Sequence, residues 1–491
     1  MNFSFIDLIV IFIYLFIITL VGLYFSNTKN SKDFFLADKN LPWYFIMLSI
    51  IATETSSLTF LNVPGISFKS DFSFLQIAFG FIIGRIIVAF YILPLYYSNN
   101  YISVYQWIGD NLGIDTQKYT SAVFLITRVL ADGVRLYATS IPITFILKGY
   151  LGDYFSDHQI SILTLFIITF TTILYTVYGG FKSVVITDSI QFIVYIGGGI
   201  YALVHLFNSI DGTSLNEILV RGQESGKFIF YHGFEGSFFK SPYYFINGVL
   251  SGILISIGSH GVDQMFAQRL LACGNLQDSK KALIGSGIFV FIQFALFLSI
   301  GFLLFIFFKG VDIPQDKVFS KYIIENIPSP VIGLLIAAIL ASAMSTLSSS
   351  INSMSLSFII DFMKKSSSEE PSLFLSRIIS IGWGFILFLS SMMPYFMSES
   401  ITNGLVDLGL KITSFTFGPL IGLFLLARMQ KKISFASFDL VFSLFATIIS
   451  TILLTYLLAP ALGLIIPTGF ILFNTYIGLF ELKRIVFQRR V

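Results

Sequence analysis

Long apolar stretches alternate with short polar segments along almost the whole chain. A helix that crosses the hydrocarbon core of a bilayer needs about 20 predominantly apolar residues. Windows of that length predict thirteen membrane spans. They cover residues 5–27, 42–66, 73–98, 119–147, 159–178, 184–208, 242–263, 282–308, 329–361, 374–396, 405–427, 434–458 and 462–481. The pattern therefore predicts an all-α polytopic membrane protein.

Composition supports this interpretation and excludes several other classes of protein. Hydrophobic residues make up 55% of the 491 residues and charged residues only 12%, about half the charged fraction of a soluble globular protein. One cysteine excludes a disulfide scaffold, and a net charge of +3 does not indicate a nucleic-acid binder. The sequence contains no zinc-protease motif, nucleophile elbow or Cys/His metal cluster, so we expect no enzymatic activity.

The positions of Lys and Arg predict the orientation, because cytoplasmic loops carry an excess of these residues. No basic residue precedes the first span, whereas Lys29, Lys32 and Lys39 follow it. We therefore expect a multi-pass protein of the plasma (inner) membrane, with its N-terminus outside and its C-terminus in the cytoplasm. The first span does not resemble a cleaved signal peptide, and no sensor output domain is expected after the last span.

Two predicted spans are interrupted by polar residues, glycine or proline, at residues 53–65 and 258–261. Irregular backbone at membrane depth is tolerated only where it is buried or lines a cavity. The two spans are five apart, so residues 42–208 and 242–427 are expected to form a 5+5 inverted repeat. Residues 5–27 would then be a leading helix and 434–481 two trailing helices of one transporter domain, 1–491. Helix packing through small polar residues is the alternative.

Eight ionisable residues are predicted at membrane depth, where such groups are costly and usually paired or functional. They are Glu54, Arg85, Arg128, Asp132, Arg135, Asp188, Asp407 and Lys411. Arg128, Asp132 and Arg135 are spaced to share one helix face. Asp407 and Lys411 are four residues apart, as Arg128 and Asp132 are, so they would also be neighbours on a helix. Local pairing of Arg128 with Asp132 would leave Arg135 as an anchor for a carboxylate, which Arg binds through two hydrogen bonds.

Hydroxyl groups are concentrated in the predicted span 329–361. One helical face is expected to present Ser342, Ser345, Ser348 or Ser349, and Asn352. Hydroxyls can simply bond to the carbonyl one turn back, but a hard cation such as sodium takes oxygen ligands. Asp188, which has no basic neighbour on its own helix except Lys182, would strengthen such an ion site or build a second one.

Four stretches of the chain resemble the signature of the sodium/solute symporter family, which includes proline, sugar and sialic-acid symporters. They are GGFKSVVITDSIQ at 179–191, the DQ and QR pairs within 263–269, AMSTLSS at 343–349 and FGPLIG at 417–422. No single stretch identifies the family, but the four stretches together are specific for it. The resemblance implies a leucine-transporter-type fold, with one leading helix, ten core helices and two trailing helices.

The resemblance also implies where sodium and solute would bind. A main sodium site would use the backbone oxygens of Ala52, Thr55 and Ser342 and the hydroxyls of Ser345 and Thr346. A second site would use Asp188, Ser345, Ser348 and Ser349. One or two sodium ions are therefore expected as coupling ligands, with no other cofactor. The matching solute positions are Glu54, Ser56, Thr59, Phe74, Ala78, Ser256, Ser259 and His260, and Arg135 and Lys411 are candidate bases around the same pocket.

Two departures from the family pattern leave the solute open. The carboxylate-binding arginine of the sialic-acid symporters corresponds to Ala131 here, with Arg135 one turn further on, and Glu54 stands where a neutral residue is usual. An acid and bases in one pocket would suit an amino acid or a sialic-acid-like solute, but Glu54 would equally bind sugar hydroxyls.

We therefore expect a sodium-coupled symporter that imports a small polar organic solute, carrying a carboxylate, by alternating access. The alternatives are a sodium-coupled sugar symporter and a proton-coupled symporter in which Asp188 or Glu54 titrates. The expected partners are sodium, the solute and membrane lipid. Neither nucleic acid nor a protein partner is expected.

Overall fold

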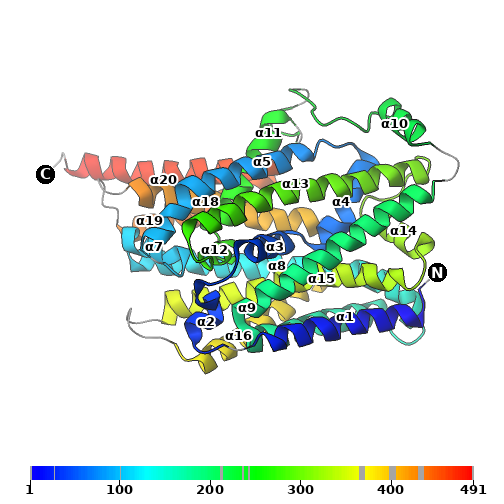
Figure 1. Cartoon of the computed structure of the whole chain (residues 1–491). Helices are drawn as coiled ribbons and strands as arrows, with labels where there is room; N and C mark the ends of the chain where they lie inside the picture. Colours follow the sequence, from blue (N-terminus) through cyan, green and yellow to red (C-terminus); the bar gives the residue numbers. More distant parts are fainter. Residues whose placement is uncertain are drawn as a thin grey trace.

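The computed structural model is all-helical, as predicted, apart from one isolated β-bridge in the described part of the chain. It describes residues 3–26, 28–99, 101–210, 214–234, 237–241, 244–363, 371–396, 405–429 and 436–488. Within these ranges, 11 helices are long and apolar enough to cross a membrane, or 12 when one bent pair counts as a span. Figure 1 shows most of them running side by side in one bundle.

Every predicted span has a helical counterpart, but the count of thirteen is not confirmed. The long elements are α1 (Phe5–Tyr24), α5 (Leu75–Ile87) continuing through η2 (Val88–Ile92) into α6 (Leu93–Ser98), α8 (Ile114–Leu151), α9 (Asp157–Asn208), α11 (Phe245–Ile257), α13 (Leu276–Phe307), α15 (Val331–Phe358) continuing into η4 (Ile359–Met363), α16 (Leu373–Ser391) followed by η5 (Met393–Phe396), α18 (Leu405–Met429), α19 (Ser437–Leu458) and, after η6 (Leu462–Leu464), α20 (Ile465–Gln488).

Helix α9 contains two of the predicted spans, 159–178 and 184–208. A straight helix of its 52 residues would be about 78 Å long, more than twice the thickness of the hydrocarbon core. Gly180 interrupts it with φ 61° and ψ −163°, a backbone conformation that only glycine adopts readily. The chain therefore leaves helical geometry between the two predicted spans.

Both spans that the sequence predicts to be interrupted are broken. Helix α3 (Trp43–Glu54) and α4 (Ser57–Lys69) are bent by 63°, because Thr55 and Ser56 between them have extended backbone. In the second case, α11 passes through a π-helical turn, η3 (Gly258–Val262), to the extended residue Asp263, and α12 (Gln264–Leu271) begins there. Each break leaves helix-end peptide groups inside the bundle.

Short helices occupy the segments between the long ones. They are α2 (Ser31–Leu36) with η1 (Ala37–Lys39), α7 (Val104–Leu112), α10 (Leu215–Glu224), α12 and α14 (Val318–Asn326). A search for membrane-length windows cannot find elements of this length. In Figure 1, α2, α7 and α12 lie at one end of the bundle, where α20 also ends, and α14 and the start of α1 lie at the other. Which end faces the cytoplasm stays a prediction.

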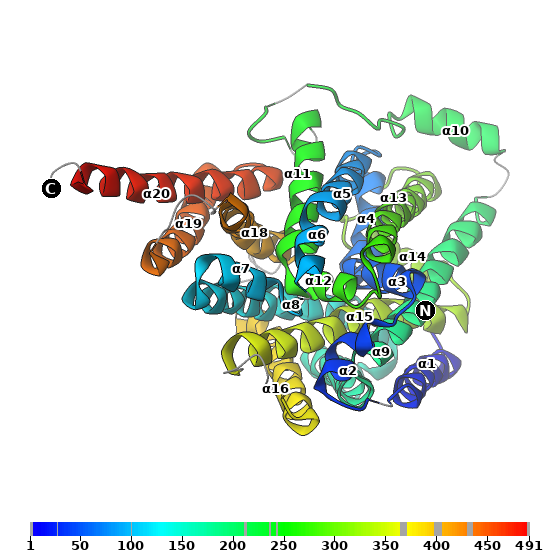
Figure 2. The ribbon, with the colours of Figure 1, turned by 60° about the vertical axis from the view of Figure 1, so that its left-hand side comes forward.

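The serine-rich helix α15 lies at the centre of the fold. Within its apolar membrane window, 89% of the residues are buried, against 28% for α19 and for α20 and 17% for α1. Figure 2 shows α20 extending outward from the bundle. The outer helices therefore present apolar side chains to lipid, whereas the hydroxyls of α15 face protein.

Candidate functional site

A small cavity lies where the break after α3 meets α9 and α15. Its lining comprises Ala52, Thr55, Gln191, Phe192, Tyr195, Ala341, Ser342 and Ser345. Four of these are predicted ligands of the main sodium site. The fifth, Thr346, donates from Oγ1 to the Ser342 carbonyl at 3.1 Å and to the Thr53 carbonyl at 3.3 Å. The structure therefore brings together residues that stand almost 300 positions apart in the chain.

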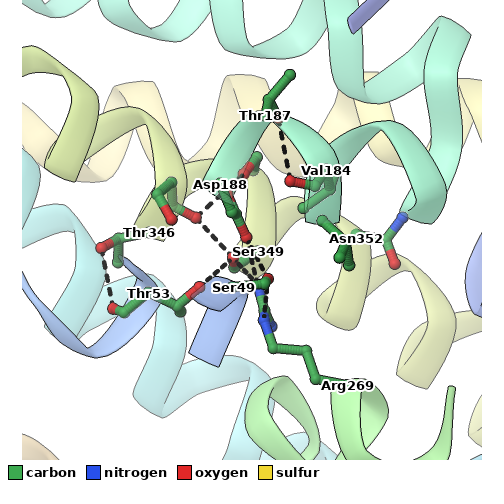
Figure 3. Close-up of polar contacts among 12 residues, drawn as sticks. Ser49, Thr53, Val184, Thr187, Asp188, Arg269, Thr346, Ser349 and Asn352 are labelled. Carbon is green, nitrogen blue, oxygen red and sulfur yellow. Dashed lines mark hydrogen bonds and ion pairs between the residues drawn. The ribbon is translucent and has the colours of Figure 1, made fainter. Parts of the chain in front are cut away.

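One helical turn from this cavity, Asp188 of α9 lies in a buried polar cluster. Its Oδ2 accepts a hydrogen bond from Ser49 Oγ at 2.6 Å and one from Arg269 Nη2 at 3.2 Å. Ser348 Oγ lies 3.5 Å from Oδ1. Figure 3 shows Asp188 and Ser49 with the Arg269 side chain reaching toward them from α12.

Arg269 is the cation that Asp188 requires. Its guanidinium is completely buried and donates to Ser49 Oγ at 2.9 Å and to the Met265 carbonyl at 2.6 Å. It also bonds Ser349 Oγ, which shares a 3.0 Å hydrogen bond with Thr53. The residues predicted for a second sodium site are thus together, but the positive charge beside them belongs to Arg269. The sequence signal was the QR pair of the 263–269 stretch, which periodicity alone did not connect to Asp188.

Glu54, the last residue of α3, forms an ion pair with Arg85 of α5. The Arg85 side chain is fully buried, whereas that of Glu54 is 19% exposed. Arg85 also donates to Ser286 Oγ of α13 at 2.8 Å. These contacts fix the orientation of the Glu54 carboxyl group at the break.

The candidate solute residues of span 242–263 lie against α5 and within η3. Ser256 Oγ donates to the Phe81 carbonyl at 3.2 Å. Ser259 Oγ lies 2.8 Å from His260 Nδ1, and the imidazole of His260 packs on Phe266 with ring centroids 4.6 Å apart. Ser256, Ser259 and His260 are buried.

The remaining candidates of the N-terminal half are partly buried near the break. Ser56, Thr59 and Phe74 have intermediate exposure, and Phe74 makes an edge-to-face contact with Phe294 of α13. Ala78, which carries no polar group, is completely buried.

The charged face of α8 connects three elements. Arg128 binds Asp263 at the start of α12 at 2.5 Å and lies 3.6 Å from Asp132. Asp132 accepts from Ser350 of α15 at 2.5 Å and lies 3.3 Å from Arg135. The predicted local pairing is therefore present, but the shorter contact of Arg128 is to Asp263. Arg135, whose side chain is 22% exposed, shares Asp132 with Arg128.

Lys411 lies on α18 and is partly buried. The side chain of its predicted partner Asp407 lies outside the described residues, so this pairing stays a prediction.

The sequence pattern of the Sodium:solute symporter family matches residues 34–437, which include the break, the cavity and the charged cluster. The chain belongs to this family. Membership makes it a sodium-coupled solute transporter rather than an enzyme, and a multi-pass membrane protein. It also confirms the resemblance carried by the four stretches.

Individual relatives of this symporter differ in their named solutes. The chain is 26% identical over 443 residues to the sodium/sialic acid symporter SiaT of Proteus mirabilis (strain HI4320), covering 88% of this chain and 86% of the relative. It is 25% identical over 419 residues to the human sodium/iodide cotransporter, covering 83% of this chain and 62% of that one. At these identities the family is shared while the solute varies.

Solved structures of transporters share the fold. A substrate-bound, outward-open Na⁺-coupled sialic acid symporter superposes with a TM-score of 0.84 at 23% identity, over 97% of both chains. Mhp1, a nucleobase-cation-symport-1 family transporter, gives a TM-score of 0.56 at 13% identity, over 93% of this chain and 96% of Mhp1. The fold is therefore the predicted leucine-transporter type.

Proposed function

We propose that this symporter binds sodium in the cavity between α3, α9 and α15 and uses it to import a small polar organic solute that carries a carboxylate. The observation that carries this proposal is the convergence of Ala52, Thr55, Ser342 and Ser345 on one cavity. Carbonyls released at a helix break and hydroxyls are the oxygen donors that sodium requires. Thr346 adjoins them through its bond to Ser342.

The proposal includes a second sodium site, formed by Asp188, Ser345, Ser348 and Ser349. The oxygens are close to one another, but Arg269 already balances the charge of Asp188. Sodium would therefore bind there only when the guanidinium moves away from the carboxylate. One sodium ion per cycle needs no such movement.

Sodium coupling is favoured over proton coupling by the ion pairs of the two candidate proton carriers. Asp188 lies beside Arg269 and Glu54 beside Arg85. Protonation of either carboxylate would leave a buried guanidinium without its countercharge, which is costly at this depth. Each sodium ion moving inward across about −100 mV supplies roughly 2.3 kcal/mol of electrical driving force.

For the solute, an amino acid or a sialic-acid-like molecule is supported by charges of both signs around the break. Arg135 is the candidate partner of the solute carboxylate, because it is partly exposed and shares its acid with Arg128. The relatives named for sialic acid support the same class. A sugar is the second candidate, because the partly exposed Glu54 can accept hydrogen bonds from hydroxyl groups.

Transport is proposed to follow alternating access between two inverted five-helix repeats, 42–208 and 242–427, within a single transporter domain and with thirteen spans in all. The matching breaks after α3 and after η3 support this organisation. The N-terminus is proposed to be outside and the C-terminus in the cytoplasm, in the inner membrane.

Uptake into proteoliposomes tests the function. Labelled sialic acid, amino acids and sugars are offered at fixed pH, with a sodium gradient, a proton gradient or neither. We expect accumulation of a carboxylate-bearing solute only with the sodium gradient. Accumulation driven by protons in sodium-free buffer would contradict the proposed coupling ion.

A further inference from the structure

A buried amide of α9 lines the cavity with an unused acceptor. Gln191 is 1% exposed and belongs to the cavity lining, and its amide group lies within hydrogen-bonding reach of the hydroxyls of Tyr14 and Tyr175. Its Oε1 accepts no hydrogen bond within the described chain. An unsatisfied buried polar group costs about 1–3 kcal/mol. This acceptor beside the cavity therefore indicates a bound species that supplies the missing interaction.

The chemistry of the lining limits what that species can be. No carboxylate lines the cavity, and Asp188, one turn before Gln191, is paired with Arg269. A shell of neutral oxygens suits a monovalent cation, because divalent cations such as calcium are held mostly by carboxylates. The amide oxygen of Gln191 is a ligand of the same type as a peptide carbonyl.

We propose that Gln191 Oε1 is a further ligand of the sodium ion in this cavity. The inference rests on the proposed sodium site and extends it to a third element, because the other ligands come from α3, its break and α15. Sodium would then connect the broken helix to α9 and α15 together. Release of the ion would free the break from both helices at once.

Sodium-dependent thermal unfolding of the purified protein, without solute, tests this assignment. NaCl replaces KCl at constant ionic strength, and the melting temperature is measured as a function of sodium concentration. A ligand that binds only the folded state stabilises it by RT ln(1 + [L]/Kd), so the dependence yields Kd for sodium. We expect Gln191→Leu to raise this Kd at least tenfold, corresponding to about 1.4 kcal/mol. Gln191→Glu, which keeps an oxygen at this position, is expected to retain the response.

Gln76→Leu is the matched control. Gln76 on α5 is also buried, and both of its amide atoms lack a partner among the described residues, but it does not line the cavity. It should leave the sodium response at the wild-type value. An equal loss in Gln76→Leu would overturn the inference, since the effect would then come from amide removal in general.

The two proposals fail in different ways. A wild-type Kd for sodium in Gln191→Leu overturns the role of Gln191 and leaves the sodium site standing. No sodium response in the wild type overturns the sodium site and this inference together. If Gln191→Leu does not fold, Gln191→Asn replaces it. We expect the shorter side chain to weaken the sodium response without changing the melting temperature in potassium, and an unchanged response would overturn the inference.

Discussion

Arg269 Nη2 lies 3.2 Å from Asp188 Oδ2, and neither side chain is more than 1% exposed. This ion pair connects the short helix after the second break to the long helix α9. Both partners also bond Ser49 of α3. The two broken regions are thus joined through one buried charge pair beside the sodium cavity.

Removing one member of this pair should destabilise the protein strongly. Asp188→Asn leaves the guanidinium of Arg269 buried without its countercharge, which costs about 3–5 kcal/mol for a buried ion pair. We expect a large fall in melting temperature in detergent. Arg269→Gln should lower the melting temperature similarly, because it leaves the Asp188 carboxylate buried without its countercharge.

The double variant Asp188→Asn/Arg269→Gln provides the control. Since both charges are then absent, its melting temperature should lie above that of either single variant. Additive losses would contradict a direct interaction between the two side chains.

The hydroxyl of Ser345 should be required for sodium-specific stabilisation. It lines the cavity and lies within hydrogen-bonding reach of the Asp188 carboxylate. Ser345→Ala should therefore reduce the shift in melting temperature that sodium produces, beyond any loss of stability that it causes in potassium. Ser353→Ala on the same helix is the control, because within the described residues the Ser353 hydroxyl bonds the Ser350 carbonyl and does not line the cavity. If both variants keep the shift, Ser345 is not a ligand.

Local sequence features predicted the breaks, the serine face of α15 and the two candidate carboxylates. They did so because proline, glycine and hydroxyl residues at membrane depth are visible against an apolar background. Asp188 could be recognised as needing a cation because a carboxylate is equally visible against the apolar background of its helix.

The partners of these groups could not be read from the same features. Arg269 follows Asp188 by 81 positions, and Arg85 reaches Glu54 from another helix, so helical periodicity does not connect them. Gln191 carries no charge and follows the signature aspartate by one turn. Only the shared cavity distinguishes it from a packing residue.

Glu54 should determine which solute is accepted. Glu54→Gln removes the partly exposed carboxylate at the break, and hydroxyl or ammonium groups of a solute then lose an anionic acceptor. We expect weaker competition by amino-bearing solutes or sugars in the uptake assay, with little change for solutes that carry only a carboxylate. Arg85 would lose its countercharge, so stability should also fall, by about 3–5 kcal/mol.

A double variant separates stability from recognition. Glu54→Gln/Arg85→Met removes both charges and should recover part of the stability while keeping the altered solute profile. Recovery of the wild-type profile would show that Glu54 acts only through folding.

The pair between Arg128 and Asp263 should control access to Cys273, the one cysteine of the chain. Cys273 follows α12 and is completely buried, and burial raises the pKa of its thiol to about 12. The thiolate is the form that reacts, so wild-type protein should label very slowly with maleimide between pH 7 and 9. Asp263→Asn removes the charged contact that holds α12 to α8 while keeping a residue that caps the helix.

We expect Asp263→Asn to label at least tenfold faster, because a hydrogen bond between charged groups contributes about 1.5–3 kcal/mol. The rate should rise with pH, since an exposed cysteine has a pKa of about 8.5 and more thiolate forms as that value is approached. If sodium favours the state in which α12 is held against the bundle, sodium should slow labelling of the wild type relative to potassium. Asp157→Asn, in a solvent-exposed pair with Lys148, is the control and should label like the wild type. An Asp263→Asn rate equal to that of the control would show that this ion pair does not hold α12 closed.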